Sequence, residues 1–148
     1  MAKRVEPKRK TPADVLNDLR NGHQEAIGHG PEEAQRYLTK VLSAQHSLPN
    51  AVKFFAHDLL VEACYQAGDT QACMEALEGA ERYMPAAQED AEREFRDYLP
   101  ELRFCERGIS VYSDEGDVEK AVALCDVAIA LGLGKAYEAK RQSLERRL

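Results

Sequence analysis

The sequence predicts an all-α fold of stacked antiparallel helical hairpins, with six to seven helices. The main observation is a spacing that occurs twice, after Gly68 and after Gly116. The fifth, ninth and twelfth residues beyond each glycine are small or apolar: Cys73, Leu77 and Ala80 in one copy, Ala121, Cys125 and Ala128 in the other. A segment of helical period also precedes each glycine, so each copy is typical of a helix, a tight turn and a second helix. Such hairpins stack because none can bury its apolar face alone.

Local signals place the first two helices. Thr11 can cap a helix and Pro12 suits its first position, so a helix begins there and reaches about residue 20 or continues towards Ile27. Glycines then interrupt the chain. Pro31, followed by two glutamates that favour a helix N-terminus, begins a second helix over 31–46. We expect a flexible basic tail over 1–11 and a single helical domain over 12–148.

The next two helices form the first repeated hairpin. Pro49 and Asn50 begin a helix that runs to the turn at Gly68. Its partner begins near Thr70 and is expected to end at about Tyr83, because Pro85 cannot donate a helical hydrogen bond.

An apolar stripe follows with alternating gaps of four and three residues: Ala91, Phe95, Tyr98, Leu102, Cys105, Ile109 and Tyr112. It runs past Pro100 without losing its phase. We therefore expect one long helix near 88–114, kinked before Pro100, with two separate helices as the alternative. The exposed part of the stripe, at Ala91, Phe95 and Tyr98, needs cover from the N-terminal helix, from a second copy in a homodimer, or from a client.

The last two helices follow from the second turn and from the C-terminal pattern. The helix after Gly116 carries the second set of small residues, and a terminal helix over 135–148 follows it. Tyr137 and Leu144 can cover the preceding hairpin there, while the charged residues between them face water, so we expect this helix to cap the stack.

The composition is that of a globular protein, 44% apolar and 31% charged. No apolar run approaches the about 18 residues that span a bilayer, so no membrane partner is expected. The four cysteines, which form no C-x-x-C pair, all fall on apolar stripes: Cys64, Cys73, Cys105 and Cys125. We expect buried, reduced thiols and a cytoplasmic location.

Charge is divided along the chain. Residues 1–10 carry +4 and residues 135–148 carry +3, so with a total of −6 the intervening residues carry −13. An acidic body opposes phosphate binding, and we expect no nucleic-acid partner.

No motif indicates an enzyme. The run from Gly132 to Lys135 lacks the first glycine and the final Ser or Thr of a phosphate-binding loop. The four histidines have no metal-ligand spacing, and no serine or cysteine has an evident activating base. The sequence therefore predicts no catalytic residue, no cofactor and no metal.

The two copies resemble tetratricopeptide (TPR) repeats, over about half of the chain. The first copy matches the pattern of that family at His57, Leu60, Val61, Cys64, Cys73, Leu77, Ala80 and Pro85, and the second at Cys105, Gly108, Ile109, Tyr112, Ala121, Cys125 and Ala128. Neither copy has the tryptophan of the family, and Leu133 stands where the final proline would be.

The resemblance implies that the first helix of each hairpin lines a concave groove that binds a peptide or a partner helix. The groove positions would be Phe55, Asp58, Glu62 and Tyr65, then Arg103, Glu106, Ser110 and Ser113. Because this set is acidic and aromatic, a basic or amphipathic partner is expected. The same positions could equally be solvated helix faces.

The sequence thus favours a protein-protein interaction module that acts as an adaptor or scaffold. The alternative is a small, acidic, TPR-like chaperone or a self-associating scaffold. That alternative is an analogy at the level of the fold.

Overall fold

The computed structural model describes residues 11–44, 48–91 and 95–148. Within these residues it contains seven α-helices, one 3-10 helix and no strand, which confirms the all-α class. The helices are α1 (Pro12–Ile27), α2 (Pro31–Ala44), α3 (Asn50–Ala67), α4 (Thr70–Ala91), η1 (Arg96–Glu101), α5 (Phe104–Asp114), α6 (Val118–Ala130) and α7 (Ala136–Glu145).

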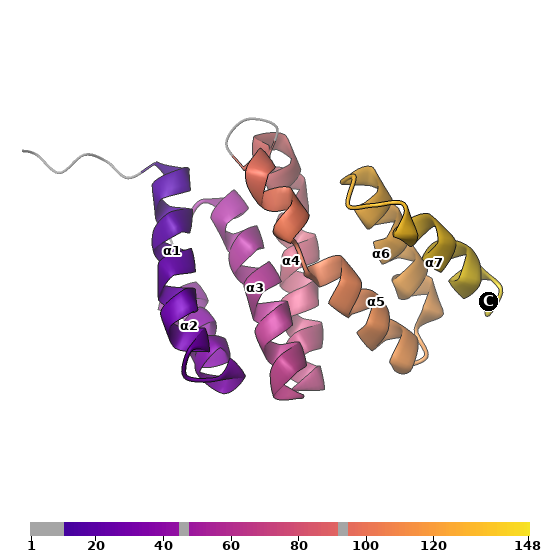
Figure 1. Ribbon diagram of the computed structural model, residues 1–148, viewed down its shortest axis with the longest axis horizontal. Coiled ribbons are helices and arrows are strands. Elements are labelled where there is room, and N and C mark those ends of the chain that lie inside the picture. Colours follow the sequence, from indigo (N-terminus) through magenta and orange to yellow (C-terminus); the bar gives the residue numbers. More distant parts are fainter. Residues whose placement is uncertain (1–10, 45–47, 92–94) are drawn as a thin grey trace, which may run out of the picture.

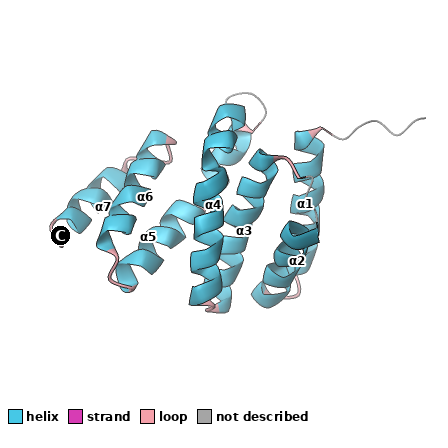
Figure 2. Ribbon diagram, turned by 180° about the vertical axis from the view of Figure 1, so that it is seen from behind, coloured by secondary structure: helices cyan, strands magenta, loops and turns pink. Residues whose placement is uncertain are grey.

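The helices lie side by side in a row that follows the order of the sequence (Figure 1). Helices α1, α3 and α5 lie on the side facing the viewer in Figure 1, and α2, α4 and α6 lie behind them, as the reverse view in Figure 2 shows. Helix α3 is central, because it packs against α1, α2, α4 and α5. Ten of its residues are buried.

The two glycine turns are built alike. Gly68 and Gly116 adopt φ values of 75° and 83°, a left-handed conformation that glycine adopts at little cost. The aspartate that follows each glycine, Asp69 or Asp117, donates its backbone N–H to a carbonyl five residues earlier, at 3.0 and 2.8 Å. Its side chain then accepts a backbone N–H three residues later, at 3.2 Å in both turns. The repeated Gly-Asp pair therefore ends one helix and caps the next.

Several predicted boundaries need correction. Of the two alternatives for the first helix, the longer one is found, since it continues past Asn21 and Gly22 to Ile27. The second helix ends at Ala44, with residues 45–47 outside the described part. Pro85 does not end α4, which runs through it to Ala91. A proline removes one helical hydrogen bond, but Ala87 beyond it is buried against the core, so packing maintains the helix.

The expectation of one long kinked helix over 88–114 is wrong. Residues 92–94 lie outside the described part, but η1 ends at Glu101 and α5 begins only at Phe104. Between them, Leu102 is extended, with φ −63° and ψ 135°. Pro100 removes one α-helical hydrogen bond, but it lies within η1, and the helical conformation ends beyond it, at the extended Leu102. The alternative of separate helices is the one that the structure contains.

The apolar stripe is covered within the chain. Phe95 is fully buried, and its ring centroid lies 5.3 Å from that of Phe55 on α3. The Tyr98 hydroxyl donates to Oδ1 of Asn17 on α1 at 2.9 Å, and the Arg20 guanidinium lies 4.5 Å from the centre of the Tyr98 ring. Helix α3 therefore contacts Phe95, and the N-terminal helix α1 covers Tyr98. The side chain of Ala91 lies outside the described part.

Replacing Phe95 tests whether this cover is core. We expect Phe95→Ala to lower the free energy of unfolding by about 3–5 kcal/mol, since it removes a fully buried aromatic ring. Ile27→Ala is the matched control, because Ile27 is 36% exposed and such substitutions shift stability by about 0.5 kcal/mol or less. Urea denaturation followed by circular dichroism measures both.

Sedimentation equilibrium of the wild type completes this test. Because Phe95 has no exposed surface, we expect no homodimer through this stripe. A wild-type dimer that Phe95→Ala dissociates into folded monomers would contradict the assignment of the stripe to the core.

Candidate functional site

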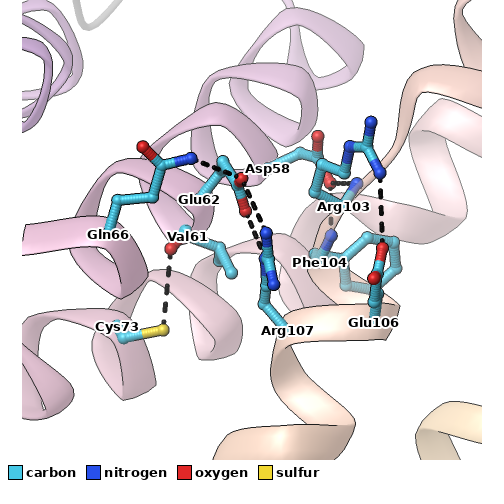
Figure 3. A network of polar contacts seen from close by, with 9 residues as sticks. All are labelled: Asp58, Val61, Glu62, Gln66, Cys73, Arg103, Phe104, Glu106 and Arg107. Carbon is cyan, nitrogen blue, oxygen red and sulfur yellow. Dashed lines mark hydrogen bonds and ion pairs between the residues drawn. The ribbon is translucent and has the colours of Figure 1, made fainter. Parts of the chain in front are cut away.

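The polar residues predicted to line a groove meet where α3 packs against α5. Asp58, Glu62 and Tyr65 are spaced four and three residues apart on α3, which places them on one face of that helix. Arg103 directly precedes α5, and Arg107 lies one turn further along. We call Glu62, Tyr65, Arg103 and Arg107 the α3–α5 surface, and Asp58 lies buried beneath it; Figure 3 shows all of these residues except Tyr65, with their polar contacts.

Asp58 joins the two helices from a buried position. Its side chain is 3% exposed, and Oδ1 accepts the backbone N–H groups of Arg103 at 2.9 Å and Phe104 at 2.7 Å (Figure 3). These are N–H groups at the start of α5, which have no partner within the helix. Asp58 therefore acts as an N-cap supplied by another helix. Burial raises the pKa of its carboxyl to about 7, although both N–H groups oppose that rise.

Glu62 and Arg107 form a two-point ion pair. Arg107 Nε lies 2.6 Å from Glu62 Oε2, and Nη2 donates to Oε1 at 3.1 Å. Gln66 donates a further hydrogen bond to Glu62 at 2.8 Å. The hydrogen bond from Arg107 is the main cause that lowers the pKa of Glu62. Planar pairing of this kind fixes orientation as well as distance.

Tyr65 extends this arrangement to the surface. The Arg107 guanidinium carbon lies 4.4 Å from the centre of the Tyr65 ring, within the range of cation–π attraction. Tyr65 is nevertheless 38% exposed, and it is one of three large hydrophobic side chains exposed to this degree in the described part of the chain. The ring is thus held from one side and open to solvent on another.

The other predicted groove residues are distributed unevenly. Phe55 is 5% exposed and packs among Phe54, Phe95 and Tyr98, so it belongs to the core and offers no surface to a partner. Asp58 is equally unavailable. Arg103 and Glu106 pair with each other at 3.3 Å on the exterior, and Ser110 is half-buried.

Arg107 is the residue that sequence reasoning missed. It is not among the predicted groove residues, and the structure places it against both Glu62 and Tyr65. The available signal was its position one turn beyond Arg103, on the helix expected to face α3.

The described residues suggest little chemical reactivity. All four thiols are buried, and burial raises the pKa of Cys64 to about 12 and that of Cys73 to about 11, so both stay protonated at neutral pH. Burial lowers the pKa of His57 to about 4, and its ring stacks on Tyr83 at 5.7 Å. In this part of the chain, no group of three His, Cys, Asp or Glu side chains is arranged to hold a metal ion.

No described helix combines the length and apolar character needed to cross a membrane. The chain matches no known family model, no curated protein and no solved structure. The geometry of the α3–α5 surface is therefore the basis of the functional proposal below.

The pKa of Asp58 predicts a pH-dependent stability. The folded-state pKa of about 7 lies above the ordinary value of 3.8, so the folded state binds this proton more tightly than the unfolded state. The contribution of Asp58 to stability is largest below about pH 4, falls as the pH rises to 7, and is constant above 7. We expect Asp58→Asn, whose side-chain oxygen can still accept both N–H groups, to flatten this slope.

Urea midpoints at pH 4.5 and 8 measure the change in slope. We expect an effect on the order of a few kcal/mol, since each pKa unit corresponds to about 1.4 kcal/mol. Asp97→Asn, which changes an exposed aspartate on η1, serves as the control and should keep the wild-type slope. An Asp58→Asn protein with the same slope as the control would disprove this role for Asp58.

A double-mutant cycle tests the Glu62–Arg107 pair. We expect Glu62→Gln and Arg107→Gln to show a coupling energy of about 1 kcal/mol or more, because the pair is bidentate and its side chains are only 18% and 26% exposed. The exposed Arg103–Glu106 pair, at 55% and 44%, should give less than about 0.5 kcal/mol. Equal coupling energies in the two cycles would show that the Glu62–Arg107 pair stabilises the fold no more than an exposed ion pair does.

Proposed function

We propose that this chain is a non-catalytic protein-protein interaction module, in which a partner peptide or helix binds along the α3–α5 surface. In this proposal the helices form a TPR-like stack of antiparallel hairpins, α1 with α2, α3 with α4 and α5 with α6, and α7 caps the end. The two Gly-Asp turns of matching geometry support the repeat. The Cys73 thiol near the start of α4 lies 3.6 Å from the Val61 carbonyl, and Tyr83 far along α4 stacks on His57 early in α3, as antiparallel pairing requires.

The observation that carries the proposal is Tyr65, an exposed aromatic ring held in place by an organised polar network. Arg107 covers one part of the ring, Glu62 holds Arg107 at two points, and Gln66 holds Glu62. Tyrosine and arginine are enriched among residues that dominate binding energy at interfaces. A ring that is already fixed loses little side-chain entropy when a partner covers it.

Charge indicates the kind of partner. The chain carries a net charge of −6. Glu62 is paired with Arg107 and Glu106 with Arg103, so the negative charge that a partner meets lies at Asp114 and Glu115, at the end of α5. Complementary charge raises association rates and selects against partners of like charge. A basic or amphipathic segment is therefore the partner that this surface favours, and a polyanion such as nucleic acid is disfavoured.

Selection from a random peptide library displayed on phage tests this function. We expect the purified full chain to select peptides that bind with micromolar affinity. Tyr65→Ala should weaken a selected peptide at least about tenfold, which corresponds to about 1.4 kcal/mol, because the ring is the exposed anchor. Isothermal titration calorimetry measures the affinities.

Ile27→Ala is the matched control, since Ile27 is exposed to nearly the same extent, 36% against 38%, and lies on α1. It should leave the affinity within about twofold. A library that yields no binder, or binders indifferent to Tyr65→Ala, would refute the proposed function.

A further inference from the structure

A cavity of about 130 Å³ opens beside Tyr65, where the end of α3, the beginning of α4 and the end of α5 meet. Its lining residues are Cys64, Tyr65, Gly68, Thr70, Cys73, Val111, Asp114 and Glu115. A cavity of this size holds several water molecules, and it therefore admits the end of a long side chain. The two repeated turns approach each other here, since Gly68 lies in the lining and Glu115 directly precedes Gly116.

The inner wall of the cavity is apolar and the rim is polar. Cys64, Cys73 and Val111 are 0%, 1% and 7% exposed, so they form a buried apolar wall. The elevated thiol pKa values of Cys64 and Cys73 keep this wall uncharged at neutral pH. Two exposed residues, Tyr65 and Thr70, complete the lining.

The negative charge of the rim is not neutralised from within. Asp114 and Glu115 are both exposed, and neither forms an ion pair with a basic group in the described part of the chain. Arg147 donates to the Ser113 hydroxyl at 2.7 Å. The guanidinium of Arg107, which lies over the Tyr65 ring, is engaged by Glu62. An outside cation therefore has two carboxylates available.

We propose that this cavity receives a lysine side chain of the partner segment that binds the α3–α5 surface. The inference rests on the proposed function and specifies its partner. The four methylene groups of a lysine lie against the wall of Cys64, Cys73 and Val111, in the manner of a charged side chain that buries its apolar stem. The ammonium group, a compact head with three donors, remains at the rim beside Asp114 and Glu115. A neutral side chain of equal length gains the apolar contact alone, and an acidic one is repelled.

Two defined peptides test the cavity directly. The probes are acetyl-Gly-Gly-Lys-Gly-Gly-amide and its twin with norleucine in place of lysine, which keeps the chain of methylene groups and removes the charge. Each is titrated into the full chain, and amide chemical shifts are followed by nuclear magnetic resonance. We expect saturable shifts at Tyr65, Val111 and Asp114 with the lysine peptide, at least threefold weaker binding of the norleucine peptide, and weaker lysine binding at higher salt.

Charge-matched variants assign the effect to the rim. The double variant Asp114→Asn, Glu115→Gln should weaken lysine binding at least fivefold. The control, Glu25→Gln, Glu32→Gln, makes the same change in net charge at exposed positions on α1 and α2 and should bind as the wild type does. No shifts at the cavity, equal binding of the two peptides, or equal affinity of the two double variants would overturn the proposal.

The outcome also separates this inference from the proposed function. Library peptides that depend on Tyr65, combined with no response of the cavity to the lysine probe, would refute the lysine site and leave the interaction module intact. Cavity shifts with the lysine probe, combined with no library binder, would support the lysine site and refute the wider peptide-binding surface.

Discussion

The junction between Asp58 and the first turn of α5 is the interaction on which the rest of the site depends. The chain does not continue as one helix from η1 into α5, because Leu102 between them is extended. A new helix therefore begins at Phe104, and its first N–H groups need acceptors. Asp58 provides one oxygen to two of them. A local interruption in one segment is thus satisfied by a buried carboxylate from a helix more than 40 residues earlier.

This junction fixes where the following turn of α5 lies. Asp58 on α3 holds the N–H groups of Arg103 and Phe104. One turn further along each helix, Glu62 on α3 faces Arg107 on α5. The pairs advance in step along both helices, and Tyr65 comes next on α3 against Arg107. The exposed ring is therefore positioned by a series of contacts that begins in the core.

Burying the Asp58 carboxyl carries a free-energy cost, which its raised pKa records. A well-packed apolar residue could fill the same volume at lower cost, but it could not accept the two N–H groups. Leaving those groups without partners would cost about 1–3 kcal/mol each. The Asp58 carboxyl thus fixes where α5 starts. We infer that its main role is to specify this start, and that its contribution to stability is secondary.

The sequence predicted what local chemistry decides. The tight turns at Gly68 and Gly116 were predicted because a left-handed φ is a local property of glycine, whereas the aspartate caps beside them were found only in the structure. The burial of the cysteines followed from helical spacing. The effect of Pro85 and Pro100 was not predictable in this way. Both residues break the same hydrogen-bond pattern, yet α4 continues through Pro85 and the helix after Pro100 has to restart.

The candidate site shows the same division. Spacing correctly placed Asp58, Glu62 and Tyr65 on one face of α3, but it could not tell which of them faces the core. Phe55 shares that face and is buried, because η1 and its aromatic residues lie over the first half of α3. Beyond Asp58 that cover ends, and the face becomes accessible at Tyr65. Which part of a helical face remains open is decided by segments far along the chain, and no periodicity within α3 encodes it.

The apolar stripe explains why a wrong helix assignment still gave the right contacts. Phe95 and Tyr98 are three residues apart, and side chains at this spacing align in a 3-10 helix as they nearly do in an α-helix. Both rings therefore reach the same wall, formed by Phe55 of α3, and Leu102 is buried as well. The periodicity of apolar residues reports which side chains share a wall. It does not report whether the backbone between them is continuous, and the extended Leu102 separates η1 from α5 without changing the face that is buried.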